Sequence, residues 1–252
     1  MSKFQDKLLN KKIVVVGGTS GIGYGAAEAL LECGAHLTVI STSQDRVNSA
    51  VEKLKGFSPH VSGLVGDVRD EDGFVQVLKS LAPIDHLIFS GVDKIIRGKL
   101  EDLNLDDAKH LFGVKFWGAV TIGKAVQKYD IIGPGGSLTL TSGIAAHKPG
   151  KGASVGGALN GGVLSLTLGL ANDLAEKKIR VNTVVPGLVK TELWDKLGRS
   201  PEQQQEDFAS ASKKLPVGFV ATPRDIAEAY VFCVRADFAT GTLLTIDGGA
   251  TL

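Results

Sequence analysis

The sequence contains little cysteine and almost no net charge. Its two cysteines, Cys33 and Cys233, have no CxxC neighbour, and we interpret both as buried structural thiols. The 28 Lys and Arg nearly balance the 27 Asp and Glu, so we expect no nucleic-acid partner, because such a partner would need a broad basic surface. The five histidines are scattered without a metal-ligand spacing, so we expect no metal site.

A hydrophobic leader is missing as well. The first residues, MSKFQDKLLNKK, alternate charge with a few apolar side chains, so we expect no secretion signal and a cytoplasmic location. Residues 152–172 carry no charge, and the stretch is long enough to span a bilayer. Six glycines and several polar side chains make it too polar for a membrane helix. We therefore expect no membrane partner and a soluble helix that is buried on several sides.

Glycine, in contrast, is abundant. The chain has 32 glycines in 252 residues, nearly twice the average usage of about 7%. They follow no triplet period and lie among apolar runs that can build a core, which excludes collagen and a disordered chain. The sequence is compatible with one domain of about 250 residues, the size range of a single α/β unit.

Apolar, β-branched runs alternate with helix-like segments along the chain. The runs predict strands at residues 12–16, 37–40, 61–65, 86–90, 137–141, 181–185 and 243–246. The segments between them predict helices at residues 24–33, 44–54, 71–81, 105–129, 155–176 and 224–234. This alternation requires parallel pairing with right-handed crossovers. The sequence therefore predicts a single doubly wound α/β domain over residues 1–252, with a seven-stranded parallel sheet and helices on both faces.

A glycine-rich turn joins the first predicted strand to the first predicted helix. Gly17, Gly21 and Gly23 form a GxxxGxG pattern directly after Val16. The first glycine allows a sharp exit from the strand, and the other two let backbone approach a pyrophosphate and let the helix pack closely on the sheet. The free N–H groups of the helix N-terminus bind the anion. The pattern in this context indicates a dinucleotide site.

Four segments in the right order resemble the short-chain dehydrogenase/reductase family, over essentially the whole chain. They are Val16–Gly23 (the family's TGxxxGIG, with Val16 for threonine), Asp67-Val68, Arg180–Gly187 with Thr191 (RVNxVxPG…T), and Thr240-Gly241 with Asp247–Gly249 (TG…DGG). The resemblance implies a Rossmann-type oxidoreductase. It also implies cofactor contacts at Gly17, Thr19, Ser20, Gly21, Ile22, Gly23, Asp67, Val68, Ser90, Gly91, Pro186, Gly187, Val189 and Thr191.

The residues after the second predicted strand favour one cofactor. NAD-binding enzymes place a carboxylate directly after this strand, where it binds the ribose 2′-hydroxyl and would repel a 2′-phosphate. This chain has Ser41, Thr42 and Ser43 there, and Asp45 lies beyond the expected position. The hydroxyls and the Arg46 guanidinium suit a phosphate. We expect NADP(H), with NAD(H) less favoured; the alternative is that Arg46 is only a solvated helix charge.

The family's usual catalytic residues have no counterpart in this sequence. Family members use an asparagine, a serine, and a tyrosine with a lysine four residues later, and the tyrosine supplies the proton. Matching residues 171–175 to the family's AxExLA pattern places the tyrosine position at Gly156 and the lysine position at Asn160. The serine position falls on Gly143, and the asparagine position falls on Lys115. The resemblance therefore implies an atypical branch that lacks this Asn-Ser-Tyr-Lys tetrad.

Two functions fit a retained nucleotide site beside a missing tetrad. The first is an NADPH-dependent reductase of an imine, an iminium ion or another bulky secondary-metabolite substrate, because hydride addition to an iminium carbon requires no acid. Lys115 and Ser142 are then the candidate catalytic residues. Lys115 would act as a proton donor or a cation, and Ser142 would bind a substrate heteroatom. The alternatives without a catalytic role are that Lys115 is solvated and that the Ser142 hydroxyl is hydrogen-bonded to backbone at the end of the strand. The second function is a catalytically silent dinucleotide-binding protein, a redox-responsive regulator or an assembly subunit.

Residues 190–215 interrupt the alternation of strands and helices. Residues 202–207 are polar, and Gly198 and Pro201 break the pattern. Ligands of doubly wound sheets bind at the carboxyl ends of the strands, so we interpret the segment as an insertion over the cofactor cleft, either a lid or a mobile surface loop. The family resemblance also implies a homodimer or homotetramer, which the uncharged, glycine-rich helix from Val155 suits.

Overall fold

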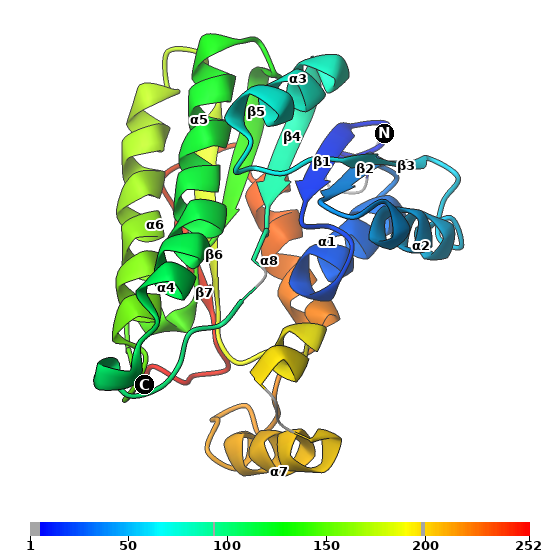
Figure 1. Ribbon diagram of the computed structural model, residues 1–252. Helices are drawn as coiled ribbons and strands as arrows, with labels where there is room; N and C mark the ends of the chain where they lie inside the picture. The colour runs from blue at the N-terminus through cyan, green and yellow to red at the C-terminus, as the bar shows by residue number, and fades with distance from the viewer. Residues whose placement is uncertain (1–5, 93, 198–199) are drawn as a thin grey trace.

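Seven parallel strands form the central sheet (Figure 1). The structure is a computed structural model that describes residues 6–92, 94–197 and 200–252. The strands are β1 (Lys12–Val16), β2 (His36–Ser41), β3 (Val61–Val65), β4 (Ile84–Phe89), β5 (Ile132–Thr141), β6 (Arg180–Pro186) and β7 (Leu243–Ile246). Their order across the sheet is β3-β2-β1-β4-β5-β6-β7, and all neighbours are parallel. The strand order reverses between β1 and β4, which confirms the predicted doubly wound Rossmann-type fold.

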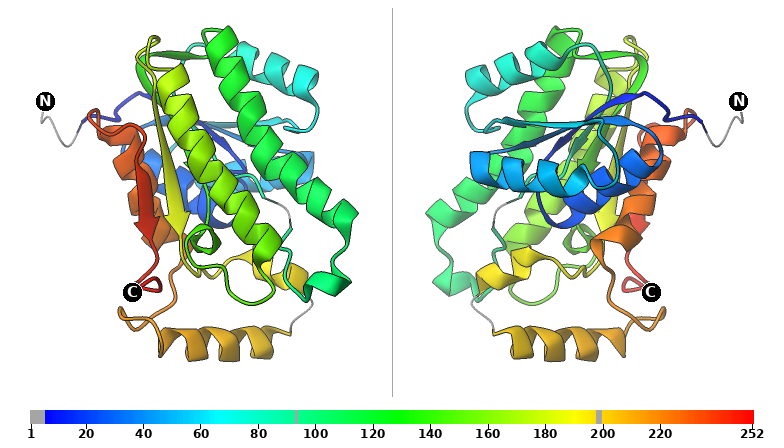
Figure 2. Two further views of the ribbon diagram at one scale, coloured as in Figure 1. Left: turned by 90° about the vertical axis from the view of Figure 1, so that its left-hand side faces the viewer. Right: turned by 90° about the vertical axis from the view of Figure 1, so that its right-hand side faces the viewer.

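Helices cover both faces of the sheet (Figure 2). They are α1 (Gly21–Glu32), α2 (Gln44–Leu54), α3 (Glu71–Leu81), α4 (Leu105–Phe112), α5 (Gly118–Lys128), α6 (Ser154–Asp173), α7 (Pro201–Ser212) and α8 (Pro223–Arg235). The shorter helical segments are η1 (Leu100–Asp102), η2 (Gly113–Trp117), η3 (Ile144–Ala146) and η4 (Glu192–Leu197). Helices α3, α5 and α6 pack on one face, and α1, α2 and α8 pack on the other, each group over its own hydrophobic core.

The central strand β1 shows how the sequence builds both cores. Val14 and Val16 point into the core beneath α3, α5 and α6, whereas Ile13 and Val15 point into the core beneath α1 and α8. A strand that is covered on both faces needs apolar side chains at consecutive positions, and the β-branched run supplies them. The two-sided burial confirms helices on both faces of the sheet.

The helix predicted at residues 105–129 is not continuous. A π-helical turn, η2, separates α4 from α5 and contains Lys115. Such a turn carries one extra residue and is often found at functional sites. The hydrophobic pattern continues through the turn, so the interruption could not be predicted from that pattern. The turn reorients the segment that carries Lys115 relative to a regular helix.

The predicted insertion at residues 190–215 contains regular structure. After β6 the chain forms η4 and α7, while Gly198 and Arg199 lie outside the described residues. Our interpretation of Pro201 as a break was wrong: Ser200 and Gln203 form a capping box, and Pro201 occupies the first turn of α7, where its missing N–H costs nothing. Figure 2 shows α7 beyond the carboxyl ends of β6 and β7, set apart from the rest of the fold.

Helix α6 corresponds to the uncharged stretch of the sequence. By length and composition it is the one described helix that could cross a membrane, with a mean hydropathy of 1.3 in its most apolar window, 28% of which is buried. A core helix passes the same test. Val163 and Leu170 of α6 contribute to the core beneath α5, and the helix also packs on β6 and η3. The prediction that this helix is buried on several sides was wrong, because the buried residues of α6 form a single stripe that packs on the sheet.

Candidate active site

The turn between β1 and α1 is closely packed at the carboxyl edge of the sheet. Gly17 has a φ of +82°, and a Cβ there would lie 2.8 Å from the main-chain nitrogen of Gly91. A Cβ at Gly23 would lie 2.2 Å from the carbonyl oxygen of Gly17. Both positions therefore require glycine. Ser20 makes no side-chain cap to α1, so the N-terminal N–H groups are not covered by a hydroxyl and suit an anion.

The segment after β6 lies against this turn. The main-chain N–H of Gly21 donates to Glu192 Oε2 over 3.1 Å. The side chain of Thr191 would contact a Cβ at Gly21 at 3.4 Å. Val189 is buried and forms a bridge with Ala221. The structure thus brings the predicted nicotinamide-end residues next to the predicted phosphate turn.

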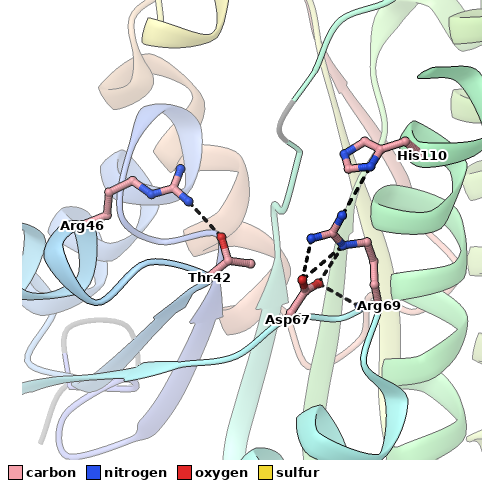
Figure 3. Close-up of polar contacts among 5 residues, drawn as sticks. All are labelled: Thr42, Arg46, Asp67, Arg69 and His110. Carbon is pink, nitrogen blue, oxygen red and sulfur yellow. Dashed lines mark hydrogen bonds and ion pairs between the residues drawn. The ribbon is translucent and has the colours of Figure 1, made fainter. Parts of the chain in front are cut away.

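A guanidinium and two hydroxyls gather at the end of β2. Arg46 Nη2 donates to Thr42 Oγ1 over 2.9 Å, and the main-chain N–H of Arg46 donates to Ser43 Oγ over 3.4 Å. Figure 3 shows the Arg46 side chain turned back over Thr42. Ser41 is the last residue of β2. The cluster is basic and rich in hydroxyl groups. Arg46 is exposed, so its position beside the strand is compatible with a phosphate ligand and with a solvated helix charge.

Asp67, after β3, is held by a neighbour that the sequence reasoning missed. Arg69 donates to it through Nε over 3.0 Å, through Nη2 over 2.6 Å and through the main chain over 3.0 Å. These bonds lower the pKa of Asp67. Arg69 also lies 3.3 Å from Nδ1 of His110 on α4 (Figure 3). The contact of Arg69 with Asp67 could have been predicted from their spacing of two residues. The contact with His110 could not, because His110 is distant in sequence.

All the predicted cofactor residues lie along the carboxyl edge of the sheet. They follow β1 (Gly17, Thr19, Ser20, Gly21, Ile22 and Gly23), β2 (Ser41, Thr42, Ser43 and Arg46), β3 (Asp67 and Val68), β4 (Ser90 and Gly91) and β6 (Pro186, Gly187, Val189 and Thr191). Ser90 lies just outside β4 rather than inside it as predicted. One edge therefore carries the complete predicted set, while the contact of each residue with a nucleotide stays a prediction.

Lys115 meets the end of β5 and the middle of α6. Its Nζ donates to the carbonyl oxygen of Ser142 over 2.9 Å and to Asn160 Oδ1 over 2.7 Å. The Ser142 hydroxyl donates to the main-chain oxygen of Asn160 over 2.9 Å, which is the backbone-bonded alternative foreseen for this serine. Burial without a charged partner lowers the pKa of Lys115 to about 8. The two candidate catalytic residues thus meet at Asn160.

Gly156, four residues before Asn160, borders open space. A Cβ at Gly156 would have the carbonyl oxygen of Ile96 as its nearest neighbour, at 3.8 Å. A Cβ at the next residue, Gly157, would lie 2.9 Å from Pro149 Cβ and 3.0 Å from the carbonyl oxygen of Ala145. Packing therefore requires glycine at position 157 but not at position 156. The missing side chain at Gly156 leaves room next to the Ile96 carbonyl oxygen.

Comparisons with known proteins place this site in a family. The family model described as an SDR-like Rossmann domain matches residues 4–252. The chain belongs to the short-chain dehydrogenase/reductase family. It is 31% identical to the short-chain dehydrogenase/reductase fsr5 of Gibberella fujikuroi, over 100% of this chain and 98% of that protein. It is likewise 31% identical to malC of Malbranchea aurantiaca, over 98% and 97% of the two chains.

Solved structures agree with this assignment. The MalC reductase/Diels-Alderase from Malbranchea aurantiaca superposes with a TM-score of 0.87 at 30% identity, over 97% of this chain and 98% of that one. A small-chain dehydrogenase solved in complex with NADPH superposes with a TM-score of 0.78 at 33% identity, over 96% and 98%. This short-chain dehydrogenase/reductase is therefore an oxidoreductase by family, with the whole domain present.

The four positions assigned to the family's tetrad come together in the structure. Asn160 links them: it accepts from Lys115, its Nδ2 donates to the carbonyl oxygen of Gly156 over 2.8 Å, and its amide lies 3.4 Å from a Cβ placed at Gly143. Gly143 has an extended backbone with a φ of 179°, which any residue adopts. The absence of the tetrad itself stays a prediction from the sequence match.

Tyr230 on α8 brings a phenol close to the same edge of the sheet. Its hydroxyl lies 2.7 Å from Thr141 Oγ1 and is also hydrogen-bonded to Ser90. The residue is fully buried, and burial raises its pKa to about 12. Its proton is thus engaged and hard to release. Tyr230 is a structural group in the core rather than a replacement for a catalytic tyrosine.

Among the described residues, the cysteines form no disulfide and no group of side chains is arranged to hold a metal. Cys33 and Cys233 are free, and burial raises the pKa of the Cys233 thiol to about 12. A buried thiol of this kind is inert at neutral pH, which fits the predicted structural role of Cys233. The prediction was wrong for Cys33, which is only partly buried at the end of α1. Within residues 6–92, 94–197 and 200–252, no cluster of three or more His, Cys, Asp or Glu is arranged to hold a metal ion.

Proposed function

We propose that this short-chain dehydrogenase/reductase uses NADPH to reduce an imine, an iminium ion or a comparably bulky secondary-metabolite substrate, without a tyrosine acid. The observation that carries the proposal is that packing does not exclude a side chain at Gly156, where the family pattern expects a tyrosine. This position lies at the edge that carries the nucleotide motifs, four residues before the Asn160 that holds Lys115. A reductase that lacks a tyrosine proton donor suits an acceptor whose nitrogen already carries a positive charge. Hydride addition then gives a neutral amine.

The residues present fit NADPH. The α1 N-terminus suits the pyrophosphate, and the Arg46 guanidinium with Thr42 and Ser43 suits the 2′-phosphate, because the cluster at the end of β2 includes no carboxylate hydrogen-bonded to Arg46. The NADPH complex of the 33% identical small-chain dehydrogenase supports this cofactor. NADPH supplies the hydride. The chain's own residues bind and orient both molecules and exclude water.

Lys115 and Ser142 form the substrate side of the proposed site. Lys115 presents an ammonium of lowered pKa. Ser142 is almost fully buried and its proton is donated to Asn160, so its hydroxyl acts as an acceptor and its carbonyl holds Lys115. The MalC reductase/Diels-Alderase, a relative of 30% identity, supports a reductase activity.

Helix α7 and η4 form a wall that we propose as a lid. Trp194 Nε1 donates to the carbonyl oxygen of Val189 over 2.7 Å, and the Trp194 ring packs edge-on against Phe208 of α7. Arg97, from the loop after β4, lies over the Trp194 ring at 5.8 Å. A cavity of ≈ 560 Å³ separates η4 from α7. The wall thus connects the predicted cofactor edge, the β4 loop and α7, and a closing motion would exclude water from the site.

The exposed apolar side chains of the α5 and α6 face support the proposed homodimer or homotetramer. Trp117 and Leu168 are 59% and 46% exposed. Small residues in α6 allow another backbone to approach closely, because they project little from the helix.

A panel assay tests the function. NADPH oxidation is followed with cyclic iminium salts, imines and ketones, and NADP⁺ and NAD⁺ are titrated in parallel. We expect oxidation with iminium or imine acceptors, none with ketones, and tighter binding of NADP⁺ than of NAD⁺. If the protein binds NADP(H) tightly but no acceptor oxidises NADPH, the reductase proposal is wrong. If it binds neither nucleotide, the cofactor assignment is wrong.

A further inference from the structure

The Lys115 ammonium is held by two neutral acceptors and by no carboxylate. Ser142, from the end of β5, offers its main-chain oxygen, and Asn160, from α6, offers its amide oxygen. Among the described residues no ion pair involves Lys115. An ammonium has three N–H groups, so one of them has no acceptor among the described residues.

We propose that Lys115 donates this proton to the nitrogen of a neutral imine, and that Asn160 is the positioning residue that holds Lys115 for the transfer. The inference rests on the reductase proposed above and extends its substrates from iminium ions to uncharged imines. It assigns to Asn160 a role that goes beyond its place in the helix.

The two hydrogen bonds of Lys115 to the protein are kept after the proton has left. A neutral amine keeps two N–H groups, and the two acceptors, Ser142 and Asn160, account for both of them. The lone pair then takes the direction of the donated proton and can accept a hydrogen bond from the new N–H of the substrate. In the ammonium the third N–H has the substrate nitrogen as its proposed acceptor, and in the neutral amine the two remaining N–H groups keep their two acceptors, so the amine need not move between the two states.

Asn160 is itself fixed in one orientation. Its Nδ2 donates to the carbonyl oxygen of Gly156 over 2.8 Å, which directs Oδ1 toward Lys115. Its main-chain oxygen accepts the Ser142 hydroxyl. One residue therefore holds both groups that contact Lys115. Because the amide is polar but uncharged, it orients the ammonium without stabilising the charge as a carboxylate would.

Burial brings the acid strength of Lys115 into the useful range. Its pKa is lowered to about 8, and burial is the one cause of the shift. A general acid works best when its pKa lies near the working pH. At neutral pH the group is protonated and releases its proton more readily than a surface lysine. The residue as a whole is only half-buried.

The proposed step is balanced. A hydride from NADPH forms a C–H bond at the imine carbon, and the π electron pair of the C=N bond moves to nitrogen. That nitrogen forms an N–H bond as the Nζ–H bond of Lys115 breaks. The products are the amine, NADP⁺ and neutral Lys115, which takes up a proton from solvent. With an N-alkyl iminium ion the same hydride transfer needs no proton.

A matched pair of acceptors tests the donor. A weakly basic cyclic imine and its N-methyl iminium salt are reduced by the wild type, by Lys115→Met and by Lys128→Met, an exposed lysine control on α5. General acid catalysis typically contributes about 100-fold or more, so we expect Lys115→Met to lose about that factor on the imine and less than about 3-fold on the iminium salt. Equal losses on both acceptors, or no loss on the imine, would overturn the proposal.

Variants at position 160 test the positioning role. Imine reduction by the wild type should fall as pH rises through the pKa of Lys115. Asn160→Asp places an anion beside the ammonium and should move this fall to higher pH, and Asn160→Leu removes an acceptor and should move it to lower pH. The iminium salt should show neither shift. Unshifted imine profiles in both variants would contradict the role of Asn160.

A labelling measurement separates this proposal from the proposed function. Acetylation of the wild type by acetic anhydride is followed against pH, and each lysine is read by peptide mass spectrometry. The Lys115 midpoint should lie near pH 8, below the ordinary lysine value, and Asn160→Asp should move it upward. Lys115 titrating with the surface lysines would overturn the proton donor whether or not any acceptor is reduced. If the Lys115 midpoint is low but neither acceptor is reduced, the proposed function is wrong, while the lowered pKa of Lys115 is still supported.

Discussion

At the scale of single residues, the structure separates side chains that suit a ligand from those that serve the fold. Arg46 is hydrogen-bonded to Thr42 at the end of β2, whereas Tyr230 is fully buried in the core. The sequence predicted Arg46 and Lys115 as site residues, since each stands where the family pattern expects another group. It did not predict the contacts of Arg69 with His110 and of Lys115 with Asn160, because these join segments that are distant along the chain. The contact of Arg69 with Asp67 is local and was missed.

Arg46 gives a test of cofactor choice. Arg46→Ala removes the guanidinium that we assign to the 2′-phosphate, and a hydrogen bond to a charged group is worth about 1.5–3 kcal/mol. We expect the Kd for NADPH to rise about 10-fold or more while the Kd for NADH stays nearly unchanged, as measured by fluorescence titration at fixed salt. Lys53→Ala, at the far end of α2, serves as the control. An equal loss for both nucleotides would remove the assignment.

At the scale of elements, α6 combines a structural requirement with the proposed site. Gly157 allows α6 to contact the loop before it, and the neighbouring Gly156 leaves the space that we assign to substrate. The ends of most strands and helices followed from the hydrophobic pattern. The π-turn at Lys115 did not, since it preserves that pattern. Helix α7 was missed because Pro201 was interpreted as a break, although Ser200 and Gln203 carried the signal of a helix start.

The glycines of α6 should differ in their effect on stability. Gly157→Ala forces a Cβ against Pro149 and the carbonyl oxygen of Ala145, and overpacking of this kind costs about 1–3 kcal/mol. Gly161→Ala meets nothing within 4 Å and should stabilise the helix by about 0.5–1 kcal/mol. Urea unfolding of both variants gives the comparison. A Gly157→Ala protein as stable as Gly161→Ala would show that the close packing at Gly157 is not required.

At the scale of the whole molecule, one edge of the sheet carries the predicted function. Parallel pairing places the ends of β1, β2, β3, β4 and β6 side by side, so segments spread over the sequence reach one site. The alternating pattern was sufficient to predict this topology. The position of α7 was not predictable, because it depends on contacts such as those of Trp194 with Phe208 and Arg97.

The central claim is that hydride reaches a carbon–nitrogen double bond at the edge beside Gly156. Transfer of deuterium from NADPH labelled at C4 to an N-methyl cyclic iminium ion, followed by mass spectrometry of the product, tests it most directly. We expect one deuterium at the former iminium carbon with the wild type and loss of transfer in Gly156→Tyr, which fills the open space, with NADPH binding retained. Unlabelled product, no product, or unchanged transfer in Gly156→Tyr would contradict the account.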